Sequence, residues 1–274
     1  MKQRIIADKK VFPIGLGAMA LDEYPPKPSE EDAVDLLKYA VEKGIDFIDT
    51  ADVYGLGRNE KLIGKLSNEI KEKILIATKV GCTRPDGYSW DTNGSKEHIK
   101  EGIQDSLKRL NLKQIYLYQL HAPDHRVSFK ESIEALKELQ NKKLIKHIGL
   151  SNVSLDLLKE AQKIVNIVSV QNNFNLKFKQ DEEELLPYLT KNNIAFIPYF
   201  PLGGGRLLAN PILVSISKEL NLKPSQVALA WILNKWPTAV PIPGTRDKKH
   251  LDENIKAAEI ELSKKTIEKL DSLF

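Results

Sequence analysis

Short apolar runs alternate with helical patterns along nearly the whole sequence, and this alternation limits the fold more than any other feature. The runs that we interpret as strands are 14–17, 45–49, 74–79, 115–121, 145–151, 167–171, 194–199 and 239–242. Each is followed by a segment whose apolar residues recur at helical spacing. Because a helical crossover returns the chain to the same end of a sheet, successive strands are expected to be parallel.

The helical segments have suitable starts and stops. Ser29 precedes Glu30, Glu31 and Asp32, an N-cap followed by acids that favour the positive end of a helix, and Gly44 lies where that helix stops. The expected helices are 30–43, 60–66, 95–110, 129–140, 155–162, 181–189, 212–220, 225–234 and 248–257.

Eight strand–helix units follow one another without a linker or a break in composition. This organisation favours a closed (β/α)8 TIM barrel over an open doubly wound sheet, with residues 1–274 as a single domain and an extra helix at the C-terminal end. The residues around Asp8-Lys9-Lys10, from Arg4 to Phe12, are expected to form a β-hairpin that plugs the bottom of the barrel.

The composition is that of an ordinary globular protein with enough apolar residues for a real core. Its 41 basic and 37 acidic residues are interspersed and leave a net charge of +4, unlike a nucleic-acid footprint. No run approaches the ~20 apolar residues that span a bilayer, and residues 1–8 contain no apolar signal core. The single cysteine, Cys82, fits a reducing compartment. We expect a cytoplasmic monomer or weak homo-oligomer with no nucleic-acid or membrane partner.

Polar residues stand at the carboxyl ends of the expected strands, which meet at one mouth in a barrel. Asp49, Lys79 and His121 end three successive strands, and Tyr54 follows the first of them. Taken singly, Asp49 and Lys79 could be a structural ion pair, His121 a core histidine and Tyr54 a loop aromatic. The convergence of all four at one mouth favours a reaction site.

Several motifs, in a fixed order from Gly15 to about Asn254, resemble the aldo-keto reductase family. They are 47–55 with Asn59, Glu60 and Gly64, then 76–79, 116–121, 148–152, Gln171-Asn172, Pro198-Tyr199, 201–203, and 242–246 with Glu253-Asn254. Several independent motifs in order are more specific than any one alone. The resemblance implies NADPH-dependent reduction of an aldehyde or ketone to an alcohol by hydride transfer.

The resemblance implies a role for each of the four residues. Tyr54 would be the general acid, and neutral His121 would orient the carbonyl by a hydrogen bond to its oxygen. The Lys79 ammonium would lower the pKa of Tyr54 from the ~10 of a free phenol, and Asp49 would keep Lys79 charged. Hydride reduction leaves negative charge on oxygen, so a proton donor and a polarising group are what the chemistry needs.

The resemblance also implies a nicotinamide cofactor along the mouth. The residues expected to hold it are Ser151, Asn152, Gln171, Tyr199, Pro201, Leu202, Gly203, Gly244, Thr245, Arg246, His250, Glu253 and Asn254. Arg246 beside a helix start suits the 2′-phosphate of NADPH, whereas His250 stands where many family members carry an arginine. No metal-ligand spacing is present in the sequence, and Gly15-Leu16-Gly17 lacks the helix and third glycine of a Rossmann fingerprint.

Substrate choice is expected to rest on loop residues, here Met19, Tyr24, Trp90 and Phe200. Their bulk favours flat or aromatic carbonyl compounds, pyridoxal among them. Two other functions stay open. A cofactor-binding, redox-sensing regulatory subunit with little turnover would show a degraded set of reactive residues. A barrel enzyme that uses the Lys79 amine as a Schiff base would need neither Tyr54 nor a dinucleotide site.

Overall fold

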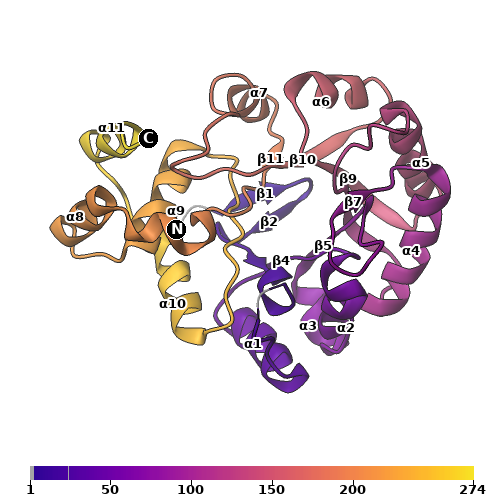
Figure 1. Cartoon of the computed structure of the whole chain (residues 1–274), viewed down its shortest axis with the longest axis horizontal. Coiled ribbons are helices and arrows are strands. Elements are labelled where there is room, and N and C mark those ends of the chain that lie inside the picture. The colour runs from indigo at the N-terminus through magenta and orange to yellow at the C-terminus, as the bar shows by residue number, and fades with distance from the viewer. Residues whose placement is uncertain (1–2, 24) are drawn as a thin grey trace.

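A single parallel sheet forms the centre of the molecule (Figure 1). The computed structural model describes residues 3–23 and 25–274. The sheet order is β11 (Ala195–Phe196), β10 (Ile167–Gln171), β9 (Ile145–Ser151), β8 (Ile115–Leu120), β5 (Leu75–Val80), β4 (Phe47–Asp49) and β3 (Leu16–Gly17). All neighbouring pairs are parallel, as predicted. The strands are buried almost throughout, because helices cover the sheet.

The last expected strand is not a regular strand, but its segment fills the same place. Val240 N donates to Phe196 O of β11 at 2.8 Å, and Gly15 N, next to β3, donates to Pro241 O at 2.9 Å. Pro241 and Pro243 have no backbone N–H, so this segment makes an incomplete ladder. Residues 238–243 therefore join the two edges of the sheet, in the (β/α)8 barrel arrangement that the sequence predicts.

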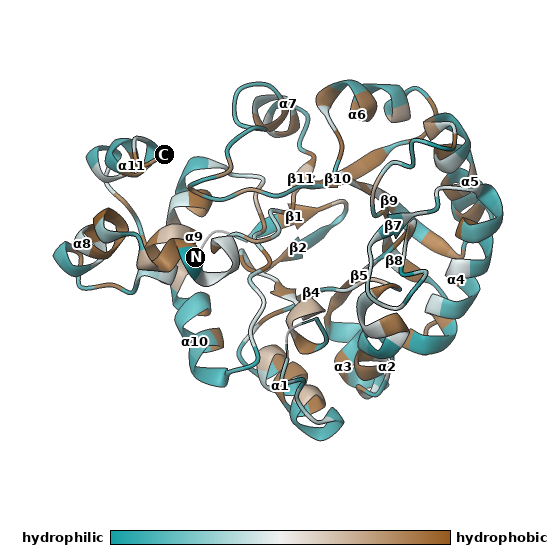
Figure 2. Cartoon of the chain, in the orientation of Figure 1, coloured by the Kyte–Doolittle hydropathy of each residue, from teal (hydrophilic) through white to brown (hydrophobic). Residues whose placement is uncertain are grey.

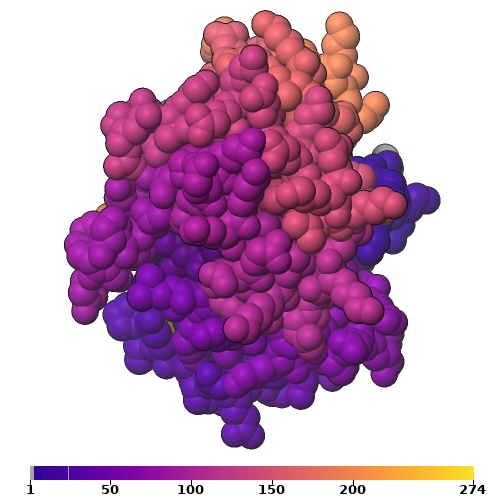
Figure 3. Space-filling model, turned by 90° about the vertical axis from the view of Figure 1, so that its right-hand side faces the viewer, coloured from indigo at the N-terminus to yellow at the C-terminus, as the bar shows by residue number. Residues whose placement is uncertain are grey.

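Helices form an outer ring around the strands (Figure 1). They are α1 (Glu30–Glu42), α2 (Arg58–Gly64), α3 (Asn68–Lys73), α4 (Lys96–Leu110), α5 (Phe129–Asn141), α6 (Leu155–Gln162), α7 (Leu185–Lys191), α8 (Pro211–Glu219), α9 (Pro224–Lys235), α10 (Lys248–Lys256) and α11 (Lys264–Asp271). In Figure 2 the strands and the helix sides that face them are mostly brown, the colour of hydrophobic residues. Figure 3 shows the side of the molecule that the magenta helices cover. The helix α11, packed on α9, is the extra C-terminal helix that the sequence predicts.

Short polar side chains fix the helix starts. The hydroxyls of Ser29, Ser95 and Ser154 each accept a hydrogen bond from the backbone N–H three residues later, at the starts of α1, α4 and α6. These bonds satisfy N–H groups that a helix leaves unpaired. The helix α7 differs, since it begins at Leu185 rather than at Asp181, whose carboxylate accepts a hydrogen bond from Asn172 at 2.9 Å. No helix in residues 3–23 and 25–274 is long and apolar enough to cross a membrane.

Two small antiparallel hairpins flank the sheet. In the first, β1 (Arg4–Ile6) pairs with β2 (Lys9–Val11), and Ile6 and Val11 pack among inward-facing strand residues such as Phe47. The predicted hairpin is therefore present and packs against the inward-facing strand residues. The second joins β6 (Cys82–Thr83) to β7 (Asp91–Thr92) after β5. The sequence does not predict it, because strands of two residues give no alternating pattern.

Candidate active site

The C-terminal ends of β4, β5 and β8 bring together four side chains, Asp49, Tyr54, Lys79 and His121, here called the tetrad. All four are buried, and Lys79 is 0% exposed. A charge at this depth needs partners, because burial removes its hydration. Part of this partnering comes from within the tetrad, and part from neighbouring backbone and amide groups.

Lys79 uses all three donors of its ammonium group. Its Nζ donates to Asp49 Oδ2 at 2.6 Å, to Thr50 O at 2.8 Å and to Tyr54 Oη at 3.3 Å. Burial acts to lower the pKa of Lys79, but Asp49 and Tyr54 outweigh it and raise that pKa. A Schiff-base lysine needs a lowered pKa, so this amine does not suit such chemistry.

Tyr54 opens the turn η2 (Tyr54–Gly57), in which Gly55, Leu56 and Gly57 have φ values of 54°, 53° and 86°. The ring is 6% exposed. Burial raises the pKa of Tyr54 to about 12, although the Lys79 cation acts in the opposite direction. Lys79 thus acts on the pKa of this phenol in the predicted direction, but the loss of hydration, which the sequence does not show, outweighs the cation and raises the net value. At neutral pH Tyr54 is a protonated donor.

Asp49 is held by two amides as well as by Lys79. Its Oδ1 accepts from Gln171 Nε2 at 2.9 Å and from Gln119 Nε2 at 3.2 Å. Gln119 is a site residue that the sequence analysis missed, although a lone glutamine inside the apolar run of β8 is a usable signal. Gln171 thus has its amide nitrogen engaged, while its Oε1 accepts no hydrogen bond from the part of the chain that the structure describes.

His121 follows β8 and faces two other rings. Burial lowers the pKa of His121 well below its usual value, and the Lys79 cation lowers it further, so the ring is neutral, as expected. Its centroid lies 5.7 Å from that of Tyr54 and 5.9 Å from that of Trp90, both edge-on. Within the described residues, the buried Nδ1 has no hydrogen-bond partner.

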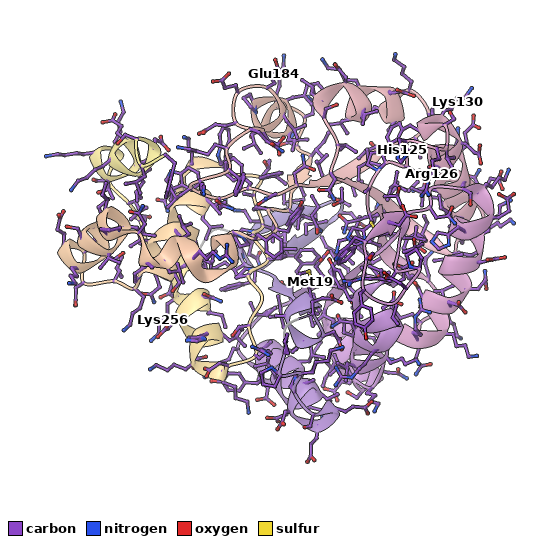
Figure 4. All side chains as sticks on the ribbon, in the orientation of Figure 1. Met19, His125, Arg126, Lys130, Glu184 and Lys256 are labelled. Atoms are coloured by element: carbon purple, nitrogen blue, oxygen red, sulfur yellow. The ribbon has the colours of Figure 1, made fainter. Side chains whose placement is uncertain are left out.

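A cavity of about 940 Å³ opens over the tetrad and reaches the start of α10. The expected site residues that line it are Met19, Asp49, Tyr54, Trp90, His121, Ser151, Asn152, Gln171, Tyr199, Phe200, Pro201, Leu202, Gly244, Thr245, Arg246, His250, Glu253 and Asn254. Met19 lies near the centre of the ring of strands (Figure 4). The structure therefore brings three of the tetrad residues, every expected cofactor residue except Gly203, and three expected substrate residues to one cavity.

Two of the described residues that were expected at the site, Lys79 and Gly203, do not line this cavity. Lys79 lies behind Asp49 and Tyr54 and donates a hydrogen bond to each. Gly203 has a φ of 57°, and a side chain at this position would meet Leu207. The two glycines that follow it line the cavity. Tyr24 lies outside the described residues.

Asn152 and Tyr199 hold each other on one wall. Tyr199 Oη donates to Asn152 Oδ1 at 2.7 Å, and Asn152 Nδ2 donates to His121 O at 2.9 Å and to Ser151 Oγ at 3.1 Å. Asn152 has a φ of 58°, a conformation that asparagine tolerates better than most residues. Its amide is therefore occupied within the protein and braces Tyr199, whereas the Ser151 hydroxyl keeps its own proton to donate.

The far end of the cavity is built around the start of α10. Asp247 Oδ1 accepts from the backbone N of Lys249 at 2.7 Å and of His250 at 3.1 Å. Arg246 Nη1 donates to Pro26 O. Asp247 was missed in the sequence, although an aspartate before a helix is a common N-cap. It occupies two backbone donors that could otherwise hold an anion.

Further unexpected residues line the cavity at the start of α9 and beside Tyr54. They are Lys223, Pro224 and Ser225 at the helix start, and Cys82 in β6. Proline in the first turn marks a helix start, so the first group was detectable. Burial raises the pKa of the Cys82 thiol to about 12, which leaves it protonated and unreactive.

The chain matches the aldo/keto reductase family model over residues 13–274. It is 40% identical over 271 residues to an uncharacterised oxidoreductase of Schizosaccharomyces pombe, covering 97% of this chain and 88% of that one. It is 34% identical over 278 residues to pyridoxine 4-dehydrogenase of Escherichia coli, covering 98% and 96%. The chain therefore belongs to the aldo/keto reductase family. Both of the relatives named above are oxidoreductases.

Solved structures agree with this assignment. A thermostable aldo-keto reductase, Tm1743, crystallised with the inhibitor epalrestat, has a TM-score of 0.89 and 31% identity, with 100% of both chains covered. An aldo-keto reductase of Klebsiella pneumoniae, crystallised with NADP and acetate, has a TM-score of 0.86 and 23% identity, covering 100% of this chain and 95% of that one. The second similarity extends to the fold alone.

Proposed function

We propose that this protein reduces an aldehyde or ketone carbonyl to an alcohol with NADPH as the hydride donor. The observation that carries the proposal is the fully buried Lys79, which holds Asp49 and Tyr54 at one end of a long cavity. A structural ion pair alone would not need a buried phenol as its third member. The pairing instead prepares a proton donor with a cation behind it.

The cavity residues fit a nicotinamide dinucleotide. Near the tetrad, the Ser151 hydroxyl and Gln171 Oε1 offer a donor and an acceptor suited to a carboxamide, and Tyr199 offers an aromatic face. At the far end, Arg246 and His250 are exposed cationic or polar side chains suited to the 2′-phosphate. The cofactor supplies hydride to the carbonyl carbon when it is bound.

The tetrad then handles the proton. Neutral His121 donates a hydrogen bond to the carbonyl oxygen and orients it, while Tyr54 Oη faces the same oxygen. As negative charge develops there, the phenol proton of Tyr54 passes to the oxygen. The Lys79 cation stabilises the phenolate that remains, and Asp49 keeps Lys79 charged and fixed.

The substrate end of the cavity favours a flat or aromatic carbonyl compound. Met19, Trp90 and Phe200 line it, and the charged lining residues other than the paired Asp49 lie toward the cofactor end. The similarity to a protein named pyridoxine 4-dehydrogenase adds pyridoxal as a candidate.

The experiment is an NADPH-consumption screen with the purified chain, in which the loss of NADPH absorbance is measured. The substrates are para-nitrobenzaldehyde, pyridoxal, phenanthrenequinone and propanal, each also assayed with NADH. We expect consumption with the aromatic carbonyls and a preference for NADPH. Binding of NADPH without consumption of any carbonyl would support the regulatory-subunit alternative instead.

A further inference from the structure

The β6–β7 hairpin places an arginine opposite a tryptophan. Its register pairs Thr83 with Asp91, so Arg84 and Trp90 are the next opposed residues. The Arg84 guanidinium lies over the Trp90 ring, 3.9 Å from the ring centroid. A planar guanidinium stacked on an indole is attractive and orients both groups.

Arg84 also ties the hairpin to the loop beside the proton donor. It forms an ion pair with Glu23 Oε2 and donates to Tyr88 O at 2.7 Å. Glu23 Oε1 accepts from the backbone N of Gly55, the residue after Tyr54, at 3.0 Å. One glutamate therefore connects the turn that carries Tyr54 to the arginine that carries the indole.

The indole needs such support. Trp90 is 49% exposed and lines the cavity, with its ring edge-on to Tyr54 at 6.3 Å and to His121 at 5.9 Å. It stands at the end of a short loop, whose tip is closed by Asp86 Oδ1 accepting from the backbone N of Ser89 at 2.6 Å. A half-exposed side chain on a loop has several rotamers available, and the stack on Arg84 selects one of them.

We propose that Arg84 is a positioning residue that holds Trp90 against Tyr54 and His121 as the wall on which an aromatic carbonyl substrate rests. Arg84 does not itself line the cavity in the described chain, so it acts through the indole. It therefore sets the affinity for aromatic substrates and leaves proton transfer from Tyr54 unchanged. The inference rests on the proposed carbonyl reductase function.

Arg126 provides a matched control, because it is an arginine of another loop that contacts the same hairpin. It lies between β8 and α5, donates to Asp91 at 3.0 and 3.2 Å, and donates to Asp124 at 3.0 Å. None of its contacts in the described part of the chain is with an aromatic ring. Arg126→Met thus removes a charged clamp from the hairpin but leaves the stack intact.

The test compares Arg84→Met, Arg84→Lys and Arg126→Met under saturating NADPH. For Arg84→Met we expect KM for para-nitrobenzaldehyde to rise about five- to tenfold, the size of one lost cation–π stack, while kcat changes less than about twofold. KM for propanal, which is too small to rest on the indole, should stay unchanged. Arg84→Lys should lie between, since it keeps the ion pair but loses the planar stack. Arg126→Met should leave the KM ratio of the two aldehydes unchanged.

A readout without turnover separates this proposal from the proposed function. Acrylamide quenching of tryptophan fluorescence should rise in Arg84→Met, and adding Trp90→Phe should remove that rise, since Trp231 is fully buried and the half-buried Trp236 is present in every variant. If the wild type reduces neither aldehyde, the proposed function fails and quenching alone decides the positioning role. If Arg84→Met and Arg126→Met give the same KM ratio and the same quenching, the positioning role is overturned. If Arg84→Met does not fold by circular dichroism, Arg84→Lys decides by the same criteria.

Discussion

The tetrad end and the α10 end of the cavity differ in how their polar groups are held. At the tetrad end, the polar side chains lie on buried strands, where no solvent competes for their hydrogen bonds. Lys79 and Asp49 are hydrogen-bonded to each other, and Asp49 is also held by buried side-chain amides. At the α10 end, Arg246, Asp247 and His250 are exposed on a loop and a helix start. Burial forces one arrangement, whereas exposure leaves water and neighbouring loops as competing partners.

The two ends are therefore expected to respond differently to substitution. At the tetrad end, removal of one group leaves its partners buried and unpaired, with large losses. At the α10 end, solvent replaces the lost contact, so losses are small and show mainly in the choice between cofactors. The following experiments test this difference.

Tyr54→Phe has the largest expected effect. Loss of the general acid should lower kcat for carbonyl reduction by about 100- to 10,000-fold. The Kd for NADPH, measured by its fluorescence, should stay within about twofold of the wild-type value. Tyr118→Phe is the control, because Tyr118 is fully buried nearby in β8 and its hydroxyl has no partner among the described residues. A Tyr54→Phe variant with the rate of Tyr118→Phe would contradict the proposed mechanism.

Lys79→Met should lower the free energy of unfolding by about 3–5 kcal/mol, since it leaves the Asp49 carboxylate buried without its cation. The measurement is urea unfolding. The control is Lys73→Met, which breaks a solvent-exposed ion pair with Glu69 and should leave the free energy of unfolding nearly unchanged. Equal losses in the two variants would remove the distinction between buried and exposed pairs.

Arg246→Ala should weaken NADPH about tenfold and NADH less than about twofold, because only NADPH carries the 2′-phosphate. Comparing the two cofactors cancels the loss of the contact between Arg246 and Pro26, which affects both. Lys256→Ala, at the opposite end of α10 (Figure 4), is the charge-matched control and should change neither Kd. Parallel losses for NADPH and NADH would place the phosphate site elsewhere.

The smallest expected effect is that of pH on reduction. Burial holds the pKa of Tyr54 at about 12, so the phenol stays protonated below that pH. Burial also holds the pKa of His121 well below its usual range, so the imidazole stays neutral at neutral pH. Between about pH 6 and 9, kcat/KM should therefore be flat. A decline of kcat/KM with rising pH, centred near the ordinary histidine pKa, would show that His121 acts as a cation.

The sequence predicted the barrel and the tetrad because both depend on patterns along the chain. Strand ends in a barrel must converge, so Asp49, Lys79 and His121 could be placed without coordinates. Three features could not be predicted in this way. The second amide on Asp49, from Gln119, depends on strand register, the β6–β7 hairpin has strands too short to show a period, and the pKa of Tyr54 depends on the depth of burial.

The joining of the sheet edges by residues 238–243 bears on how the chain is made. Synthesis runs from the N-terminus, so β3 and β11 wait with unpaired backbone groups until this late segment emerges. Unpaired strand edges recruit other chains, and very short edge strands are one protection against this. Each of these two strands has only two residues. Their brevity in the finished protein thus corresponds to a nascent sheet that offers little to a neighbouring chain during translation.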